Sequence, residues 1–329
     1  MSFDLISIGD TVVDTFIPLE DAKVLSDDGQ RMLAMRYGDK IPVGPSTSLV
    51  AGNAANNAVG GARLNLKTAI YTHVGDKDDE EYDQRIVLKF KQEKIETKYI
   101  THDKNLPSNH HIVLNFKGER TILIYHQPWQ YSLPDFDSAK RVYFTSLGPT
   151  FTKSNIVGEL INYLERTGAK LHYNPGTFQI KAVVKKYPRL LFLTEVFIVN
   201  AEEAKIILGF DESAKIDIKK LLKGLLGLGP KRVVITDGGE GSYGYEGEQY
   251  YHLEVFPAKL LEMTGAGDAY ATGVLAGFFY GKDLVEAMRW GAANGASVVE
   301  QIGPQAGLLT YEGMQEKLKE NSQIVAKEI

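Results

Sequence analysis

Short apolar segments alternate with longer amphipathic ones along most of the chain. Residues 5–8, 69–71, 197–199 and 232–235 are brief, mostly apolar runs, each of a length that suits one buried strand. Between such runs, residues 154–167 repeat apolar side chains at the spacing of one helix face. Because strands and helices take turns in this way, the pattern predicts a parallel sheet covered by helices on both faces.

Two early segments interrupt this alternation. Residues 31–49 contain strand-like residues with turn signals, and residues 110–126 have the two-residue period of a hairpin around a turn at 117–120. We expect both to belong to a small accessory sheet within one domain. The hairpin carries apolar residues on both faces, as Ile112 and Val113 illustrate. One face should then be covered by a second subunit, which predicts a homodimer.

Composition removes several classes of function. The chain has 329 residues, of which 43% are hydrophobic and 24% charged, as in ordinary globular proteins. A net charge of −5 leaves no broad basic field for nucleic acid or an anionic membrane. The absence of cysteine excludes disulfides and thiolate metal sites. No signal peptide and no apolar run of bilayer length are recognisable, so we expect a cytoplasmic protein.

The strongest chemical signal is Thr-Gly-Ala-Gly-Asp at 264–268, which opens a helix of small residues. The backbone N–H groups of Gly265, Ala266 and Gly267 are not obstructed by large side chains, and the helix start adds partial positive charge. We therefore expect an anion site there. Asp268, in the first turn, could accept the proton of an attacking hydroxyl group. An acid in a first turn also commonly serves the helix dipole alone, so these five residues leave both interpretations open.

Two further segments carry polar groups with two possible meanings. Residues 51–58 place three Asn side chains at the start of a helix, where their amides suit substrate hydroxyls or simply cap the helix. Asn200 and Glu203 follow the strand at 197–199. They could hold hydrated Mg²⁺, or they could be a helix N-cap with an acid in the first turn.

A third glycine-rich segment excludes two other nucleotide-binding classes. Gly239-x-Gly241-x-x-Gly244 matches the dinucleotide fingerprint, but the residues that follow, 243–251, have the pattern of a hairpin. The fingerprint requires a helix at that place, so a Rossmann-type NAD site is rejected. The sequence GxxxxGK followed by Ser or Thr is also absent, which excludes a P-loop kinase.

Taken together, these motifs resemble the PfkB family of carbohydrate kinases, which includes ribokinase, fructokinase and adenosine kinase. The resemblance covers essentially the whole chain. The matching positions, in family order, are Gly9 and Asp14, Gly52 and Asn56, Asn200 and Glu203, Thr236 with Gly238 and Gly241, and the segment 264–268.

The resemblance implies an α/β fold. This is the three-layer αβα ribokinase-like fold, a single domain over 1–329 with a mostly parallel central sheet and a small β-sheet lid from about 13–49 and 107–132. It implies an ATP-dependent kinase that phosphorylates a hydroxyl group of a neutral sugar. One alternative is a nucleoside kinase, with a base packed by lid residues such as Met32, Leu33, Met35, Tyr125 and Trp129. A non-catalytic ligand-binding protein is the other, and retention of Asp268 argues against it.

The resemblance also assigns roles to the matching positions. Asp268 would be the base, and the anion hole would be formed by Gly265, Ala266 and Gly267. Substrate hydroxyls would be contacted by Asp14, Gly52, Asn53 and Asn56. The ATP site would be lined by Asn174, Thr236, Gly238, Gly241 and Asn294. Mg²⁺ would be held through water by Asn200 and Glu203.

Four positions depart from the family pattern, the mildest being Ala51 in place of the first glycine of a Gly-Gly pair. Glu262 and Met263 replace the usual Asp and Thr of a stretch that helps to bind a monovalent cation in ribokinase-like members, which leaves that cation requirement open. Asn53 stands where phosphosugar kinases often have Lys. The missing positive charge argues against a phosphorylated acceptor.

Overall fold

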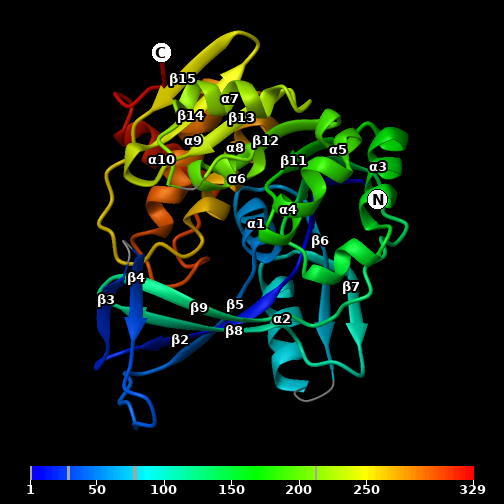
Figure 1. Cartoon of the computed structure of the whole chain (residues 1–329). Coiled ribbons are helices and arrows are strands. Elements are labelled where there is room, and N and C mark those ends of the chain that lie inside the picture. Colours follow the sequence, from blue (N-terminus) through cyan, green and yellow to red (C-terminus); the bar gives the residue numbers. More distant parts are fainter. Residues whose placement is uncertain (1, 28–29, 77–79, 212) are drawn as a thin grey trace.

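A ten-stranded sheet forms the centre of the computed structural model, which describes residues 2–27, 30–76, 80–211 and 213–329 (Figure 1). Its strand order is β16-β15-β14-β13-β12-β11-β10-β1-β6-β7. The strands are β1 (Phe3–Ile8), β6 (Thr68–Gly75), β7 (Glu96–Asp103), β10 (Ala139–Phe144), β11 (Lys170–Tyr173), β12 (Thr194–Asn200), β13 (Arg232–Thr236), β14 (Ser242–Glu246), β15 (Gln249–Leu253) and β16 (Lys327–Glu328).

Pairing is parallel from β7 through β13 and antiparallel from there to β16. Every residue of β6 is buried, as expected for a parallel strand that is covered on both faces. The predicted alternation of strands and helices therefore corresponds to a mostly parallel sheet, and the fold prediction is confirmed.

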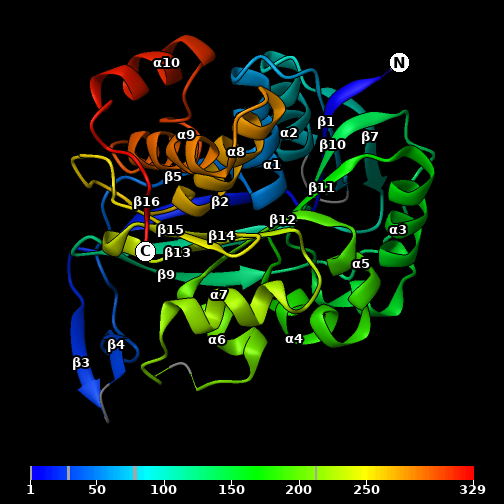
Figure 2. The same ribbon diagram turned by 90° about the horizontal axis from the view of Figure 1, so that it is seen from above.

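Helices cover both faces of this sheet (Figure 2). One face carries α1 (Asn53–Arg63), α2 (Glu80–Gln92), α8 (Ala266–Phe279), α9 (Leu284–Val298) and α10 (Tyr311–Glu320). The other carries α3 (Ile156–Thr167), α4 (Thr177–Lys186), α5 (Pro188–Phe192), α6 (Ala201–Leu208) and α7 (Ile218–Leu226). The described residues also form two short 3₁₀ helices, η1 (Pro149–Lys153) and η2 (Gly238–Glu240). Over the described ranges, no helix is both long and apolar enough to span a bilayer.

A second, small sheet lies beside the main one and has the order β5-β2-β8-β9. Its strands are β2 (Val12–Pro18), β5 (Thr47–Ala51), β8 (His110–Phe116) and β9 (Glu119–Tyr125). β8 and β9 pair as the hairpin predicted from the two-residue period. We call these four strands the small sheet.

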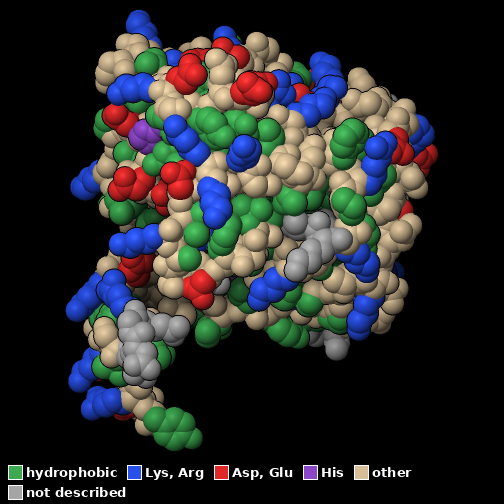
Figure 3. Space-filling view, turned by 45° about the horizontal axis from the view of Figure 1, so that its top comes forward, with side chains coloured by type: hydrophobic (Ala, Val, Ile, Leu, Met, Phe, Trp, Pro, Cys, Tyr) green, Lys and Arg blue, Asp and Glu red, His purple; other side chains and the backbone are tan. Residues whose placement is uncertain are grey.

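One part of the accessory segment behaves differently from the prediction. β3 (Lys23–Asp27) and β4 (Gln30–Ala34) pair only with each other among the described strands and do not join the small sheet. They project away from the body (Figures 2 and 3), and several of their apolar side chains, Val24, Leu25 and Met32 among them, are exposed. Residues 28 and 29 lie outside the described part. Residues 35–46, between β4 and β5, contain two glycines and two prolines, which are turn signals and separate β4 from β5.

Helix α8 is fixed tightly between α1 and α9. Most of its residues are Gly, Ala or other small side chains, and ten are buried. A Cβ atom on Gly273 would lie 2.3 Å from the carbonyl oxygen of Trp290, so only glycine allows α9 to approach this closely. The N-terminus of α8 is thereby held in a fixed place at the end of the sheet.

Candidate active site

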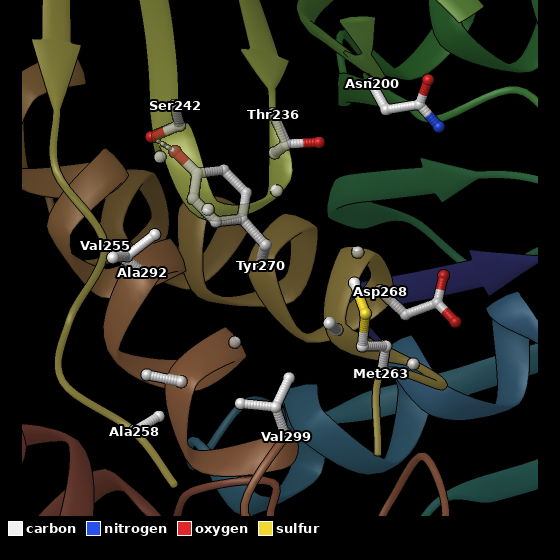
Figure 4. Close-up of a pocket in the computed structure, with 18 of the residues that line it drawn as sticks. Asn200, Thr236, Ser242, Val255, Ala258, Met263, Asp268, Tyr270, Ala292 and Val299 are labelled. Atoms are coloured by element: carbon white, nitrogen blue, oxygen red, sulfur yellow. Dashed lines mark hydrogen bonds between the residues drawn. The ribbon is translucent and has the colours of Figure 1, made fainter. Parts of the chain in front are cut away.

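A cavity of about 830 Å³ lies where β11, β12 and β13 end, beside the N-terminus of α8 (Figure 4). In open α/β sheets, ligands usually bind in a crevice outside the carboxyl ends of the parallel strands. The cavity is lined by most of the predicted site residues: Asn53, Asn174, Asn200, Glu203, Thr236, Gly238, Gly241, Gly265, Ala266, Gly267 and Asp268. Chain folding therefore brings five separate segments of the sequence to one place.

The carboxylate of Asp268 is held by two amides from α1. Nδ2 of Asn53 donates to Oδ1 at 2.9 Å, and Nδ2 of Asn56 donates to Oδ2 at 2.8 Å. Oδ1 of Asn56 in turn accepts from Nε2 of Gln305 at 3.0 Å. Asn53 and Asn56 were expected to contact substrate hydroxyls. Their amide nitrogens hold the carboxylate of Asp268, a role that sequence order alone did not indicate, and their contact with substrate hydroxyls stays a prediction.

Burial of Asp268 raises its pKa to about 6, although the hydrogen bonds from Asn56 and Asn53 oppose this shift. The negative charge of Asp14 raises the pKa further. The side chain is 8% exposed and lies in the first turn of α8, whose N-cap is Gly265. A carboxylate that titrates near neutral pH and faces a cavity is suited to accept a proton during catalysis.

Asp14 reaches this region from the small sheet. β2 and β8 pair so that Asp14 lies opposite His111, and Nδ1 of His111 is 3.2 Å from Oδ1 of Asp14. The ring of His126 packs edge-on against His111, with 5.3 Å between ring centroids. Nε2 of His111 and Nδ1 of His126 are buried and have no hydrogen-bond partner in the part of the chain that the structure describes. Such atoms are costly unless a ligand or a water molecule satisfies them.

Sequence reasoning missed both histidines. The usable signal was strand alternation, which places His111 on the same face of β8 as the buried Val113 and therefore toward the protein. His126 follows β9 directly. Burial, with a smaller effect of His111, lowers the pKa of His126 to about 4, so this ring is neutral at pH 7.

Asp10 was also missed, although it follows Gly9 at the end of β1. Both of its oxygens accept from the hydroxyl of Tyr131, and Oδ2 also accepts from the backbone N–H of Gly148 at 2.8 Å. Burial raises the pKa of Asp10 to about 7. These contacts fix the loop after β10 against the end of β1.

The other end of the cavity is largely apolar. Val255, Ala258, Ala292 and Val299 line it, as Figure 4 shows. Thr236 ends β13, and the turn through η2 places Gly238 and Gly241 in the lining. The hydroxyl of Tyr270 donates to Oγ of Ser242 at 2.8 Å across the cavity wall. Apolar walls beside a polar turn suit a flat heterocyclic base joined to a phosphate chain.

The two asparagines predicted to bind the nucleotide differ in their position relative to the cavity. Asn174 lines the cavity, with Nδ2 donating to the carbonyl of Ile198 and Oδ1 accepting from Tyr143. Asn294 is fully buried and does not line the cavity. Its amide joins α8 to the segment after α9, because Nδ2 donates to Ala269 and Oδ1 accepts from Leu309. Asn294 is therefore a core residue, although Ala292 and Gly295 of the same helix line the cavity, and its proximity to the base stays a prediction.

Asn200 and Glu203 form a reciprocal N-cap of α6. Oδ1 of Asn200 accepts from the N–H of Glu203 at 2.8 Å, and Oε2 of Glu203 accepts from the N–H of Asn200 at 2.9 Å. Both residues also line the cavity. Burial is the largest cause that raises the pKa of Glu203, with the charge of Asp268 adding to it. Asn200 and Glu203 therefore cap α6 and also line the cavity.

One candidate for stacking on a nucleoside base is excluded. Trp129 is only 2% exposed, and its ring stacks on His73 at 5.4 Å between centroids. It is a core residue, since it belongs to the hydrophobic cluster under α3. Tyr125, opposite His110 on β9, is 58% exposed.

Comparison with known proteins agrees with this geometry. The chain is 25% identical to a 5-dehydro-2-deoxygluconokinase of Clostridium perfringens, covering 98% of this chain and 94% of that protein. Its fold matches a structure of Arabidopsis thaliana ribokinase complexed with ribose and ATP, with a TM-score of 0.79, 19% identity, and coverage of 97% of this chain and 99% of that one. It also matches the nucleoside kinase of Methanocaldococcus jannaschii, with a TM-score of 0.76, 18% identity, and coverage of 96% and 98%.

A model of the pfkB family of carbohydrate kinases matches residues 29–310, which is most of the chain. The matched region includes the small sheet from β5 onward, the helix α1 with its asparagines, and the start of α8 with Asp268. The resemblance seen in the motifs is confirmed: the chain belongs to the pfkB family of carbohydrate kinases.

Proposed function

We propose that this kinase transfers the γ-phosphoryl group of ATP to a hydroxyl group of a neutral sugar. The observation that carries the proposal is the clamped carboxylate of Asp268. It lies at the N-terminus of α8, at one end of a cavity with apolar walls. The charge of Asp14, on the small sheet, contributes to raising its pKa. A base, an anion site and a second polar wall therefore meet at one point.

The reaction follows from these positions. Asp268 removes the proton of the acceptor hydroxyl as its oxygen attacks the γ-phosphorus. The bond between the γ-phosphorus and the bridging oxygen breaks, and ADP leaves with that electron pair. The backbone N–H groups at the start of α8 face the negative charge on the transferring group. Asn53 and Asn56 keep the carboxylate aimed at the acceptor throughout.

Charge around Asp268 supports a neutral acceptor. Asp14 and Asp268 interact electrostatically, and the nearest other side chains that contact Asp268 are uncharged amides. An acceptor with a carboxylate would be repelled by two acids at this end of the cavity. The relative from Clostridium perfringens is named for a gluconate, which is such an acid. We therefore infer that the acceptor is neutral next to the reacting hydroxyl, and the screen includes an acid because Arg120 also lines the cavity.

A coupled ADP-release screen with Mg-ATP tests this proposal. Ribose and fructose represent neutral sugars, 2-keto-3-deoxygluconate represents acids, and adenosine, inosine and cytidine represent nucleosides. We expect the highest kcat/KM for a neutral sugar. A preference for the acid would show that the charge argument is wrong, and a preference for a nucleoside would make the chain a nucleoside kinase.

We further propose that Mg²⁺ accompanies ATP. The capping arrangement leaves the second carboxylate oxygen of Glu203 at the cavity, and carboxylates acting through water are typical partners of Mg²⁺ on nucleotides. When bound, the ion neutralises phosphate charge. In the described residues no group of three or more acidic or imidazole side chains could cage a metal, so the phosphates themselves would supply most of the ligands. Loss of ADP release in excess EDTA tests this requirement.

The pH dependence should report Asp268. The base must be ionised to accept a proton, and its pKa is about 6 in the free protein. We expect kcat/KM to fall about tenfold per pH unit below that value, because kcat/KM reports groups of the free enzyme. The variant Asn56→Ala removes a hydrogen bond that lowers this pKa, so its acid limb should lie about one unit higher.

Asn57→Ala is the matched control for this pH profile. Asn57 is the next residue of α1, and its amide donates to Thr272 rather than to the carboxylate of Asp268. Its acid limb should coincide with that of the native protein. Equal displacement of the acid limb in the two variants would show that the pH profile does not report Asp268.

The small sheet is proposed as a lid that closes over the acceptor and excludes water, and as the contact surface of a homodimer. All seven residues of β9 are exposed, among them Leu123 at 52% and Ile124 at 61%. An apolar edge strand of this kind is usually covered. Light scattering of the purified chain measures the oligomeric state. The cytoplasmic location and the absence of nucleic-acid and membrane partners stay predictions from the sequence.

A further inference from the structure

The hydrogen bonds that hold Asp268 continue into the segment that follows α9. Nε2 of Gln305 donates to Oδ1 of Asn56 at 3.0 Å, and Nδ2 of Asn56 donates to Oδ2 of Asp268 at 2.8 Å. All three residues are buried. Gln305 is therefore connected to the carboxylate through the side-chain amide of Asn56.

Gln305 is tied to the helix that carries Asn56. Arg63, the last residue of α1, donates from Nη1 to the carbonyl oxygens of Gln305 at 2.7 Å and Leu308 at 3.3 Å. Nε and Nη2 of the same guanidinium bind the two carboxylate oxygens of Glu93. Because the end of α1 holds this backbone, the position of the Gln305 side chain relative to Asn56 is constrained.

The direction of these bonds favours a negatively charged Asp268. An amide has a donor end and an acceptor end, and both amides point their donor end toward the carboxylate. A hydrogen bond to an ionised acceptor is stronger than one between neutral groups, and bonds in a chain polarise one another. Gln305 therefore strengthens the bond from Asn56 more when Asp268 is ionised than when it is protonated.

Asn53 holds the other carboxylate oxygen without such support. Its Nδ2 donates to Oδ1 of Asp268 at 2.9 Å, but its own Oδ1 has no hydrogen bond to any residue that the structure describes. Asn53 also lines the cavity, where an incoming substrate can turn its amide. Asn56 is 3% exposed, and both ends of its amide are engaged. Asn56 is therefore the amide that can hold the carboxylate throughout the reaction.

We propose that Gln305 is a positioning residue that keeps the donor end of the Asn56 amide against Asp268, so that the carboxylate is ready to take the proton of the acceptor. The inference rests on Asp268 as the base of the phosphoryl transfer proposed above. The other charged and titratable side chains around this carboxylate and the Gln305 segment stay unchanged in the test: Asp14, Tyr143, Glu203, Glu254, Glu262 and Arg120.

The test replaces Gln305 by methionine, which has a similar length but no N–H donor. The pKa of Asp268 is followed by carbon NMR of protein labelled in its aspartate carboxyl groups, and its signal is assigned by its absence from Asp268→Asn. We expect Gln305→Met to raise this pKa by about half a unit. The shift should be smaller than that of Asn56→Ala, because the bond from Asn56 is weakened rather than removed. On the acid limb, kcat/KM should fall about threefold.

A double-mutant cycle separates this role from a general loss of structure. If Gln305 acts through Asn56, then Gln305→Met should leave the pKa of Asp268 unchanged when it is added to Asn56→Ala. An equal rise in both backgrounds, or no rise in the native background, would overturn the proposal. A purely structural role of Gln305 would lower the thermal midpoint without this dependence on Asn56.

Two further variants complete the comparison. Gln301→Met is the matched control, because Gln301 is an exposed glutamine of the same segment and does not line the cavity. Asp268 should titrate in this control as in the native protein. Gln305→Asn keeps a polar amide that is one methylene too short to reach Asn56. It should raise the pKa of Asp268 in the same way, and it takes the place of Gln305→Met if methionine prevents folding.

The NMR titration needs neither acceptor nor ATP, so it tests Gln305 even if the proposed acceptor class is wrong. A screen in which no neutral sugar is phosphorylated would refute that acceptor class alone. An active native protein, in which Asp268 titrates at the same pH with and without the Gln305 amide, would refute only the role of Gln305.

Discussion

Replacement of Asp268 by asparagine should reduce kcat by about 10²–10⁴-fold, the range expected when a general base is lost. The side chain keeps its shape, and the new amide can still accept a hydrogen bond from Asn56. Asn53 can rotate its own amide to accept from the new nitrogen, because its Oδ1 has no hydrogen bond to any described residue. Thermal unfolding and ADP affinity should therefore stay close to those of the native protein, and steady-state kinetics measures the loss.

Asp283→Asn provides the matched control. Asp283 is the N-cap of α9, where Oδ1 accepts from the N–H of Glu286 at 2.9 Å. Asparagine caps helices equally well, so neither stability nor kcat should change. If Asp268→Asn also retains native kcat, then Asp268 serves only the helix start and the assignment of the base is wrong.

Replacement of Gly267 by valine should lower kcat by about 10²-fold, because a misplacement of ~1 Å at a reacting centre has that effect. Gly267 lines the cavity, and a Cβ atom there would meet no other atom within 4 Å. The added side chain would occupy the space expected for the phosphoryl group without disturbing the packing of α8. The thermal midpoint should therefore remain near that of the native protein.

Gly265→Ala, in contrast to Gly267→Val, should lower the stability of the fold. The φ angle of Gly265 is 81°, and its Cβ would lie 2.4 Å from Cβ of Pro304. The left-handed backbone alone costs alanine about 1–2 kcal/mol, so the midpoint of unfolding should fall. If Gly267→Val loses stability as Gly265→Ala does, or keeps full activity, then the anion is not bound at the start of α8.

The sequence predicted the elements whose patterns are local. The runs at 5–8 and 232–235 lie within β1 and β13, and the hairpin at 110–126 contains β8 and β9. β10, between β1 and β11, was missed. Lys140 and Arg141 interrupt the apolar run of this strand in the sequence. The guanidinium of Arg141 nevertheless lies inside the fold, where it contacts His172 and donates to the carbonyl of Phe278.

Contacts between distant segments could not be predicted in the same way. Asn53 and Asn56 lie more than 200 positions from Asp268, and only folding shows that their amides hold its carboxylate. Asn294 was expected at the nucleotide site from the family resemblance. In the fold its amide is buried and joins α8 to the segment after α9 through two hydrogen bonds.

The central claim is that Asp268 activates a hydroxyl group of a neutral sugar for phosphorylation by ATP. Phosphorus NMR of the reaction mixture, recorded for the native protein and for Asp268→Asn with the best acceptor of the screen, tests it most directly. We expect the native protein to convert γ-phosphate into a sugar phosphate ester with one ADP per ester, and the variant to form almost none. Release of inorganic phosphate without an ester, or equal ester formation by both proteins, would contradict the account.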